Sequence, residues 1–174
     1  PGFKILTETN VPLAENLSYF GDGDEAHIVY NFPLPPILTH ALLTGSGRYL
    51  TPWCQSLPPL PKGCTYLNFT ASHDGIGLRP AEGIFDDEAL GQLIGCVKQF
   101  GGLLTQRTTP DGSERPYEAN ISLFDALKGT ITGEDDWQVE RFLLSQALMM
   151  SLAGVPAVYY NSMMAAPNNL QGVA

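Results

Sequence analysis

Two carboxylates in this sequence stand where acid–base chemistry on a small substrate could use them. Glu8 follows a short apolar run at residues 3–7, and Asp74, with His73 directly before it, follows residues 65–70. Cleavage of a glycosidic bond needs such a pair, because one carboxyl group protonates the departing oxygen while an ionised group stabilises positive charge on the sugar ring. Taken singly, Glu8 could instead cap the next turn and Asp74 could fix a His-Asp-Gly turn. Spacing alone favours these simpler roles.

The two acids would meet if the strands that precede them belong to one sheet. Runs rich in β-branched and aromatic residues predict four strands, at residues 3–7, 27–32, 65–70 and 155–160. Helices or long connections separate successive strands, which is typical of a parallel sheet with crossover helices. In such folds the substrate site lies at the carboxyl ends of the strands. Polar residues follow each predicted strand: Glu8 and Asn10, then Asn31, then His73 and Asp74, then Asn161.

The segments between these strands differ in character. Pro35 and Pro36 predict the start of a helix that ends at Gly45, since proline is tolerated in a first helical turn. The proline-rich residues 51–63 predict an irregular connection, and residues 161–169 predict a loop. Residues 78–133 resemble an insertion, with an acidic helix start at 85–90 and a hairpin at 106–117 around Pro-Asp-Gly.

A buried helix is predicted before the last strand. Thr132 is the expected N-cap, and the acidic residues 134–136 would lie in the first turn, where the helix dipole favours negative charge. The body at 137–153 is apolar on most faces, which predicts burial on all sides. Gly154 and Pro156 mark its end.

Composition excludes several classes of protein. The 174 residues carry a formal net charge of −9, which is wrong for a general binder of nucleic-acid phosphates. No apolar run approaches the ~20 residues of a membrane span. The three cysteines, Cys54, Cys64 and Cys96, give no metal-binding spacing and fit a reducing cytoplasm. No glycine-rich dinucleotide or phosphate loop follows a strand. Because the chain starts at Pro1 inside a strand-like run, we expect it to be a piece of a longer protein.

Four ordered motifs carry a resemblance to a known family. The segment Ser-His-Asp-Gly-Ile-Gly at 72–77 is similar to the His-Asp motif of the α-amylase superfamily, in the form used by its sucrose phosphorylase subfamily. Residues 6–10 resemble the family's general-acid strand, 29–42 its next strand, loop and helix, and 154–160 its last strand. Residues 73–83 and 110–118 look closest to the branch of glucosylglycerate phosphorylases and sucrose 6-phosphate phosphorylases.

This resemblance implies an α/β fold, a fragment of a (β/α)8 TIM barrel comprising strands 5 to 8. Residues 1–78 would hold barrel strands 5 to 7 with their connections. Residues 79–133 would form a small inserted domain between strand 7 and its helix. Residues 134–174 would supply the last barrel helix, strand 8 and the loop that follows. A half barrel leaves strand edges unpaired, so we expect the isolated chain to aggregate, to dimerise through the open edges or to require its missing N-terminal half.

The resemblance also implies roles for individual residues. Glu8 matches the general acid/base, Asp74 the transition-state stabiliser and His73 a donor of hydrogen bonds to sugar hydroxyls. The family's nucleophile, an Asp near the end of strand 4 with an Arg two residues before it, has no match in this chain. The weaker substrate-binding candidates are Asn10, Asn31, Arg79 and Asn169, the last standing where the subfamily often has Asp in an acceptor loop.

The function implied is part of a retaining glucoside phosphorylase that moves a glucosyl unit from a sucrose-like or glucosylglycerate-like donor to phosphate. Inorganic phosphate would be a co-substrate, and we expect no organic cofactor and no metal. The expected partners are a sugar and phosphate, without nucleic acid or membrane. Two alternatives stay open: a hydrolase or transglycosidase of the same superfamily, and a non-catalytic sugar-binding remnant that lacks the nucleophile.

Overall fold

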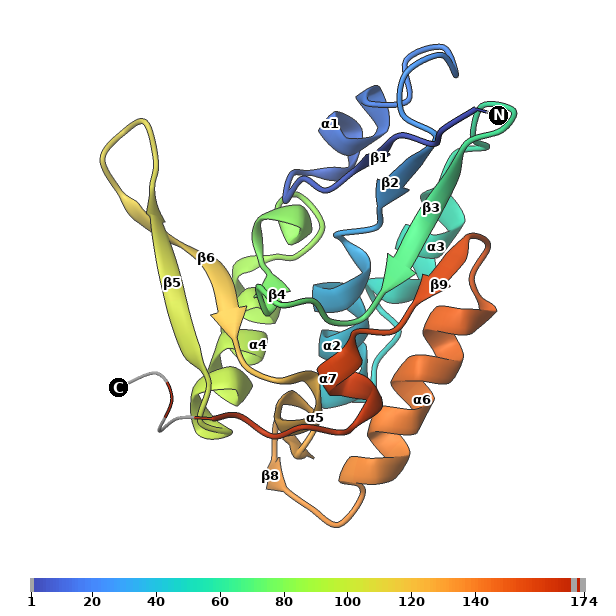
Figure 1. Cartoon of the computed structure of the whole chain (residues 1–174). Coiled ribbons are helices and arrows are strands. Elements are labelled where there is room, and N and C mark those ends of the chain that lie inside the picture. Colours follow the sequence, from blue (N-terminus) through green and yellow to red (C-terminus); the bar gives the residue numbers. More distant parts are fainter. Residues whose placement is uncertain (1, 170–171, 173–174) are drawn as a thin grey trace.

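The structure is a computed structural model that describes residues 2–169 and 172. A parallel sheet runs through it in the order β1-β2-β3-β9 (Figure 1). Its strands are β1 (Leu6–Thr7), β2 (Ile28–Tyr30), β3 (Thr65–Phe69) and β9 (Val155–Ala157). Every neighbouring pair is parallel, so the carboxyl ends of the strands share one edge. The four predicted strands are confirmed, although each is shorter than the sequence predicts.

Two helices form the main apolar layer against this sheet. α2 (Leu34–Thr44) and α6 (Gln138–Ser151) both contact β3 and each other. Leu34, Ile37 and Leu38 of α2 pack with Met149 of α6 in one buried cluster. α2 starts with prolines in its first turn, as predicted, and Gly45 ends it at φ +65°, a left-handed conformation that glycine adopts without steric cost.

Two shorter helices follow β1 and α2. α1 (Leu13–Ser18) lies between β1 and β2. α3 (Leu50–Ser56) lies at the start of the segment predicted to be irregular, and this part of the prediction was wrong. Pro52 stands in the first turn of α3, where backbone N–H groups have no intrahelical partner, so its missing N–H does no harm. The buried Trp53 then packs against α2.

The start of α6 corrects a second expectation. The helix begins at Gln138 because residues 129–134 form a small hairpin instead, from β7 (Gly129–Thr130) and β8 (Gly133–Glu134). Thr132 is therefore not its cap. Asp135 accepts a hydrogen bond from the Trp137 backbone N–H and forms an ion pair with Arg141. Burial on all sides was also wrong, since α6 buries one face and exposes a second, lined by Val139, Leu143, Leu144 and Met150.

An antiparallel sheet in the order β4-β6-β5 takes two of its strands from the segment expected to be an insertion and the third, β4, from directly before it. The strands are β4 (Ile76–Gly77), β5 (Leu103–Thr108) and β6 (Glu114–Asn120), and the β5–β6 hairpin extends away from the rest of the chain (Figure 1). A 3-10 turn η1 (Arg79–Ala81), α4 (Asp87–Gln99) and α5 (Leu123–Ala126) complete the segment. Asp86 caps α4 by accepting from the Ala89 N–H. The three-part division at 78/79 and 133/134 stays a prediction.

This segment does not pack independently of the parallel sheet. Leu43 of α2 belongs to the same buried cluster as Leu93 and Val97 of α4, and Ile76 of β4 joins them. The shared cluster fixes where β6 lies relative to the strands of the parallel sheet. The last element, α7 (Tyr160–Met163), is a single helical turn after β9, in place of the start of the expected loop. None of the described helices has the length and hydrophobicity that crossing a bilayer requires.

We predict that the two adjacent methionines of α6 differ sharply in their contribution to stability. Met149 is 0% exposed and Met150 is 55% exposed, although they share one helix and one side-chain type. Met149→Ala should lower the free energy of unfolding by about 2–5 kcal/mol, because it leaves a cavity between α2 and α6. Met150→Ala should change it by no more than about 0.5 kcal/mol. Urea denaturation followed by circular dichroism measures both, and equal losses would contradict the packing described here.

Candidate active site

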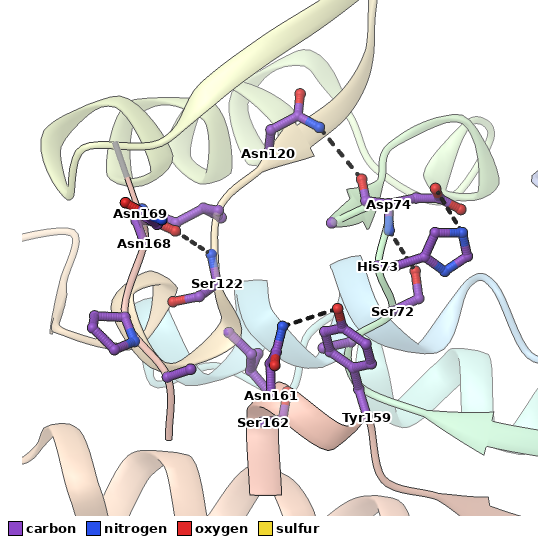
Figure 2. A pocket seen from close by; sticks show the side chains of 16 residues that line it. Ser72, His73, Asp74, Asn120, Ser122, Tyr159, Asn161, Ser162, Asn168 and Asn169 are labelled. Carbon is purple, nitrogen blue, oxygen red and sulfur yellow. Dashed lines mark hydrogen bonds and ion pairs between the residues drawn. The ribbon is translucent and has the colours of Figure 1, made fainter. Parts of the chain in front are cut away.

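Glu8, His73 and Asp74 come together at the carboxyl edge of the parallel sheet. Glu8 lies directly after β1, while His73 and Asp74 lie in the turn between β3 and β4. One side-chain nitrogen or oxygen from each of the three lies within 4.8 Å of the other two. His73 Nε2 lies 3.2 Å from Asp74 Oδ1, with the two side chains 68% and 50% exposed (Figure 2). The group is thus preassembled and open to a substrate, while its catalytic roles stay predictions.

One hydrogen bond within the turn and one from β6 hold the turn that carries His73 and Asp74. The Asp74 backbone N–H donates to Ser72 Oγ at 3.2 Å, and Asn120 Nδ2 donates to the Asp74 carbonyl oxygen at 3.4 Å (Figure 2). Gly75 follows at φ +86°, and any side chain there would collide with the backbone carbonyl of Ala119 on β6. The glycine therefore lets β6 approach the turn, and β6 in turn supports Asp74.

A cavity of about 240 Å³ opens on the Glu8 side of this turn. Tyr30, His73 and Tyr159 line it together with Glu8. Burial raises the pKa of the Tyr30 phenol, and the negative charge of Glu8 raises it further. Tyr30 therefore stays a neutral hydroxyl beside Glu8, able to donate or accept a hydrogen bond.

A second cavity, of about 300 Å³, adjoins the first and shares Ser72, His73 and Tyr159 with it. Asp74 lines this second cavity, whereas Glu8 does not. Its wall is rich in neutral amides and hydroxyls: Ser72, Asn120, Ser122, Asn161, Ser162, Asn168 and Asn169 (Figure 2). Such groups both donate and accept hydrogen bonds, which suits the hydroxyl groups of a sugar. Of the described residues that line this cavity, His73 alone can carry a positive charge.

A third carboxylate, Glu118 of β6, lies close to Asp74. Partial burial raises its pKa, and the charge of Asp74 raises it further, while a hydrogen bond donated by Asn10 Nδ2 at 3.5 Å opposes the rise. The inserted sheet thus contributes a carboxylate next to the two that the parallel sheet supplies. Asn10 belongs to the polar residues after β1 and links them to β6.

The weaker candidates of the sequence analysis lie in different places. Asn169 lines the larger cavity, and Asn10 contacts Glu118 beside it. Asn31 is 1% exposed, donates to Asn68 Oδ1 at 2.9 Å and lies outside the lining of both cavities. Arg79 Nη2 lies 3.6 Å from Glu15 Oε2, and Arg79 lines neither of the two cavities. The substrate-binding roles of all four stay predictions.

Sequence reasoning missed several residues at this edge. Tyr159 lies two residues after β9, but the strand predicted at 155–160 included it, so the rule that selected Glu8 after β1 pointed to Asn161 instead. Glu118, Asn120 and Ser122 come from the inserted segment. Its position between a strand and the following helix predicts that it starts at the carboxyl edge, but no local signal shows which of its residues return to the site. Their position follows from the packing of α4 against α2 and of β6 against the Gly75 turn.

Comparison with known proteins agrees with this geometry. No family model matches the chain. Over 99% of its length the chain is 44% identical to the glucosylglycerate phosphorylase of Spirochaeta thermophila and 41% identical to that of Escherichia coli, covering 29% and 31% of those proteins. The crystal structure of sucrose 6F-phosphate phosphorylase from Thermoanaerobacter thermosaccharolyticum superimposes with a TM-score of 0.81 at 20% identity, over 99% of this chain and 33% of that one.

The resemblance to the sucrose phosphorylase-type group is confirmed. The chain spans about a third of the length of the curated relatives that it matches. The expected fold class, an α/β segment of a (β/α)8 barrel, is confirmed by the structural match and by the parallel sheet of this chain. The assignment of Glu8, His73 and Asp74 to catalysis and sugar binding rests on the motifs and on their convergence.

We predict that Asp74→Asn lowers the pKa of Glu118 toward its ordinary value. The substitution removes one of the two causes that raise this pKa and leaves the other, burial, in place. Carbon-detected NMR titration of the glutamate carboxyl groups measures the shift. Glu114→Gln, on the same strand but exposed, is the matched control and should leave the pKa of Glu118 unchanged. An unchanged pKa of Glu118 in the Asp74→Asn variant would show that the two carboxylates do not interact.

Proposed function

We propose that this chain is part of a retaining glucoside phosphorylase that transfers a glucosyl unit from a glucosylglycerate-like or sucrose-like donor to inorganic phosphate. The observation that carries the proposal is the convergence of Glu8, His73 and Asp74 in a chain 44% identical to a glucosylglycerate phosphorylase. Two carboxylates beside cavities rich in hydroxyls and amides suit the breaking of a glycosidic bond through a cationic state.

Each residue of the group has a defined task in this reaction. Glu8 protonates the oxygen of the departing group, and in the second step it assists the incoming phosphate as a base or hydrogen-bond partner. Asp74 stabilises the positive charge that develops on the ring, and His73 donates a hydrogen bond to a sugar hydroxyl. The attacking carboxylate of a retaining reaction, an Asp in the resembling family, would come from residues outside this chain.

The proposal needs phosphate as co-substrate and no organic cofactor. A glucosyl intermediate reacts with phosphate or with water at the same carbon, so the distinction between a phosphorylase and a hydrolase depends on which acceptor reaches it. The amide-rich wall of the larger cavity supports sugar binding, and the names of the relatives support phosphate as acceptor. The reducing cytoplasm expected from the sparse cysteines remains a prediction.

We predict that the full-length protein releases glucose 1-phosphate from glucosylglycerate only when phosphate is present. The measurement is coupled detection of glucose 1-phosphate and of free glucose, with phosphate and in a phosphate-free buffer. Free glucose at an equal rate in both buffers would identify a hydrolase instead. No product from glucosylglycerate, sucrose or sucrose 6-phosphate would favour a non-catalytic sugar-binding protein.

We predict that Glu8→Gln and Asp74→Asn each lower kcat at least about 100-fold on a glycoside donor, but for different reasons. Fluoride leaves without being protonated, so Glu8→Gln should keep far more of its activity on glucosyl fluoride than on the glycoside. Asp74→Asn should lose activity on both donors, since both pass through the same charged ring. Glu25→Gln, in an exposed acidic turn, is the control and should behave as the wild type. An equal loss of kcat on both donors in the Glu8→Gln variant would exclude Glu8 as the general acid.

A further inference from the structure

The loop at 164–169, which follows α7, contains a residue in an unfavourable backbone conformation. Ala165 has φ +48°, the left-handed region that residues with a side chain rarely adopt. Local turns hold it, because the Ala165 N–H donates to the Ser162 carbonyl at 3.0 Å and the Ala166 N–H to the Asn161 carbonyl at 2.9 Å. Such a conformation persists only where the surrounding contacts determine the path of the chain.

Asn168 supplies further contacts, and both of its anchors lie on the inserted segment. Its side-chain Oδ1 accepts from the Ser122 backbone N–H at 2.6 Å (Figure 2). Its own backbone N–H donates to Asp125 Oδ2 at 2.6 Å. Ser122 and Asp125 are themselves joined, since the Asp125 N–H donates to Ser122 Oγ at 3.2 Å at the start of α5. Asn168 therefore makes two hydrogen bonds to the first residues of the α5 turn, one through its side chain and one through its backbone.

Apolar burial contributes little to holding this loop. Met164 is 66% exposed, and Pro167 and Asn169 are exposed as well. The backbone hydrogen bonds of Ala165 and Ala166 and the two hydrogen bonds of Asn168 hold the path of the described part of this loop. Hydrogen bonds to the Asp125 carboxylate are of the stronger, charge-assisted kind.

The position of this loop matters for the candidate site. Residues 166–169 line the cavity of about 300 Å³ whose opposite wall is the His73–Asp74 turn, and Asn169 lies directly after the anchored Asn168. A ligand held by His73 and Asp74 would face these loop residues. Glu8, by contrast, lines the neighbouring cavity and does not depend on the loop.

We propose that Asn168 is a positioning residue: it fastens the loop at 164–169 to the start of α5 and so fixes one wall of the substrate cavity beside His73 and Asp74. The expected effect on catalysis rests on the proposed function, whereas the contact between Asn168 and α5 does not depend on it. Loss of the anchor weakens substrate binding and leaves the chemical step, which depends on Glu8 and Asp74, nearly intact.

The anchor itself is tested by hydrogen exchange in the full-length protein. Asn168→Ala should speed exchange of the Ser122 amide at least about tenfold, because its acceptor is lost, while the amides of β2 and β3 exchange as before. Met164→Ala, in the same loop but without a polar contact, is the matched control and should leave Ser122 protected. Asn168→Asp keeps the accepting oxygen, and at high salt, where its charge is screened from Asp125, it should restore protection. An unchanged exchange rate of the Ser122 amide in the Asn168→Ala variant overturns the proposal.

The effect on binding is tested by steady-state kinetics with the glycoside donor. Asn168→Ala should raise KM about tenfold and keep kcat and its pH profile within about twofold of the wild type. A large fall in kcat with unchanged KM would overturn the positioning role. If the wild-type protein shows no phosphorolysis, the proposed function fails, whereas the exchange experiment and direct titration with the glycoside still decide whether Asn168 controls ligand affinity.

Discussion

Parallel pairing of β1, β2 and β3 is the constraint on which the candidate site depends. In a parallel sheet all strands point the same way, so the residues that follow them reach one edge whatever their separation along the chain. Glu8 follows β1 and Asp74 follows β3, with β2 between them in register. Their meeting therefore needs no direct bond between them. Reversing any one of these strands would send its polar residues to the opposite edge.

The inserted segment supplies part of the wall of the cavity of about 300 Å³ at this edge. β6 can approach the His73–Asp74 turn only because Gly75 has no side chain, and it brings Asn120 to the backbone of Asp74 and Glu118 near its carboxylate. Ser122, just beyond β6, then anchors the loop after α7. One close approach of two backbones thus connects the parallel sheet, the insertion and the C-terminal loop around the same space.

How far the sequence predicts this arrangement differs between its parts. The positions of the four strands along the chain and the polar residues at 8, 73 and 74 were predictable, because hydrophobic runs and turn residues are local signals, whereas the barrel arrangement followed from the family resemblance. The start of α6 was not predictable, because acidic residues such as those at 134–136 are typical of a first helical turn. In the structure Glu134 belongs to β8, which pairs with β7. The place of Glu118 and Asn168 depends on contacts between segments far apart in sequence, for which no local pattern exists. Tyr159 lay inside the strand predicted at 155–160, and only the earlier end of β9 at Ala157 places it among the residues after the strand.

The electrostatics of the site follow from where its charges lie. Glu8, Asp74 and Glu118 gather at one edge, and the exposure of Glu8 and Asp74 keeps both hydrated, so their mutual repulsion is screened. Glu118 is more buried and its pKa rises instead. A sugar that enters would displace water from between these groups and strengthen every interaction among them. In the proposed reaction, the negative charge of Asp74, which water screens in the open site, would then stabilise the positive charge that develops on the sugar ring.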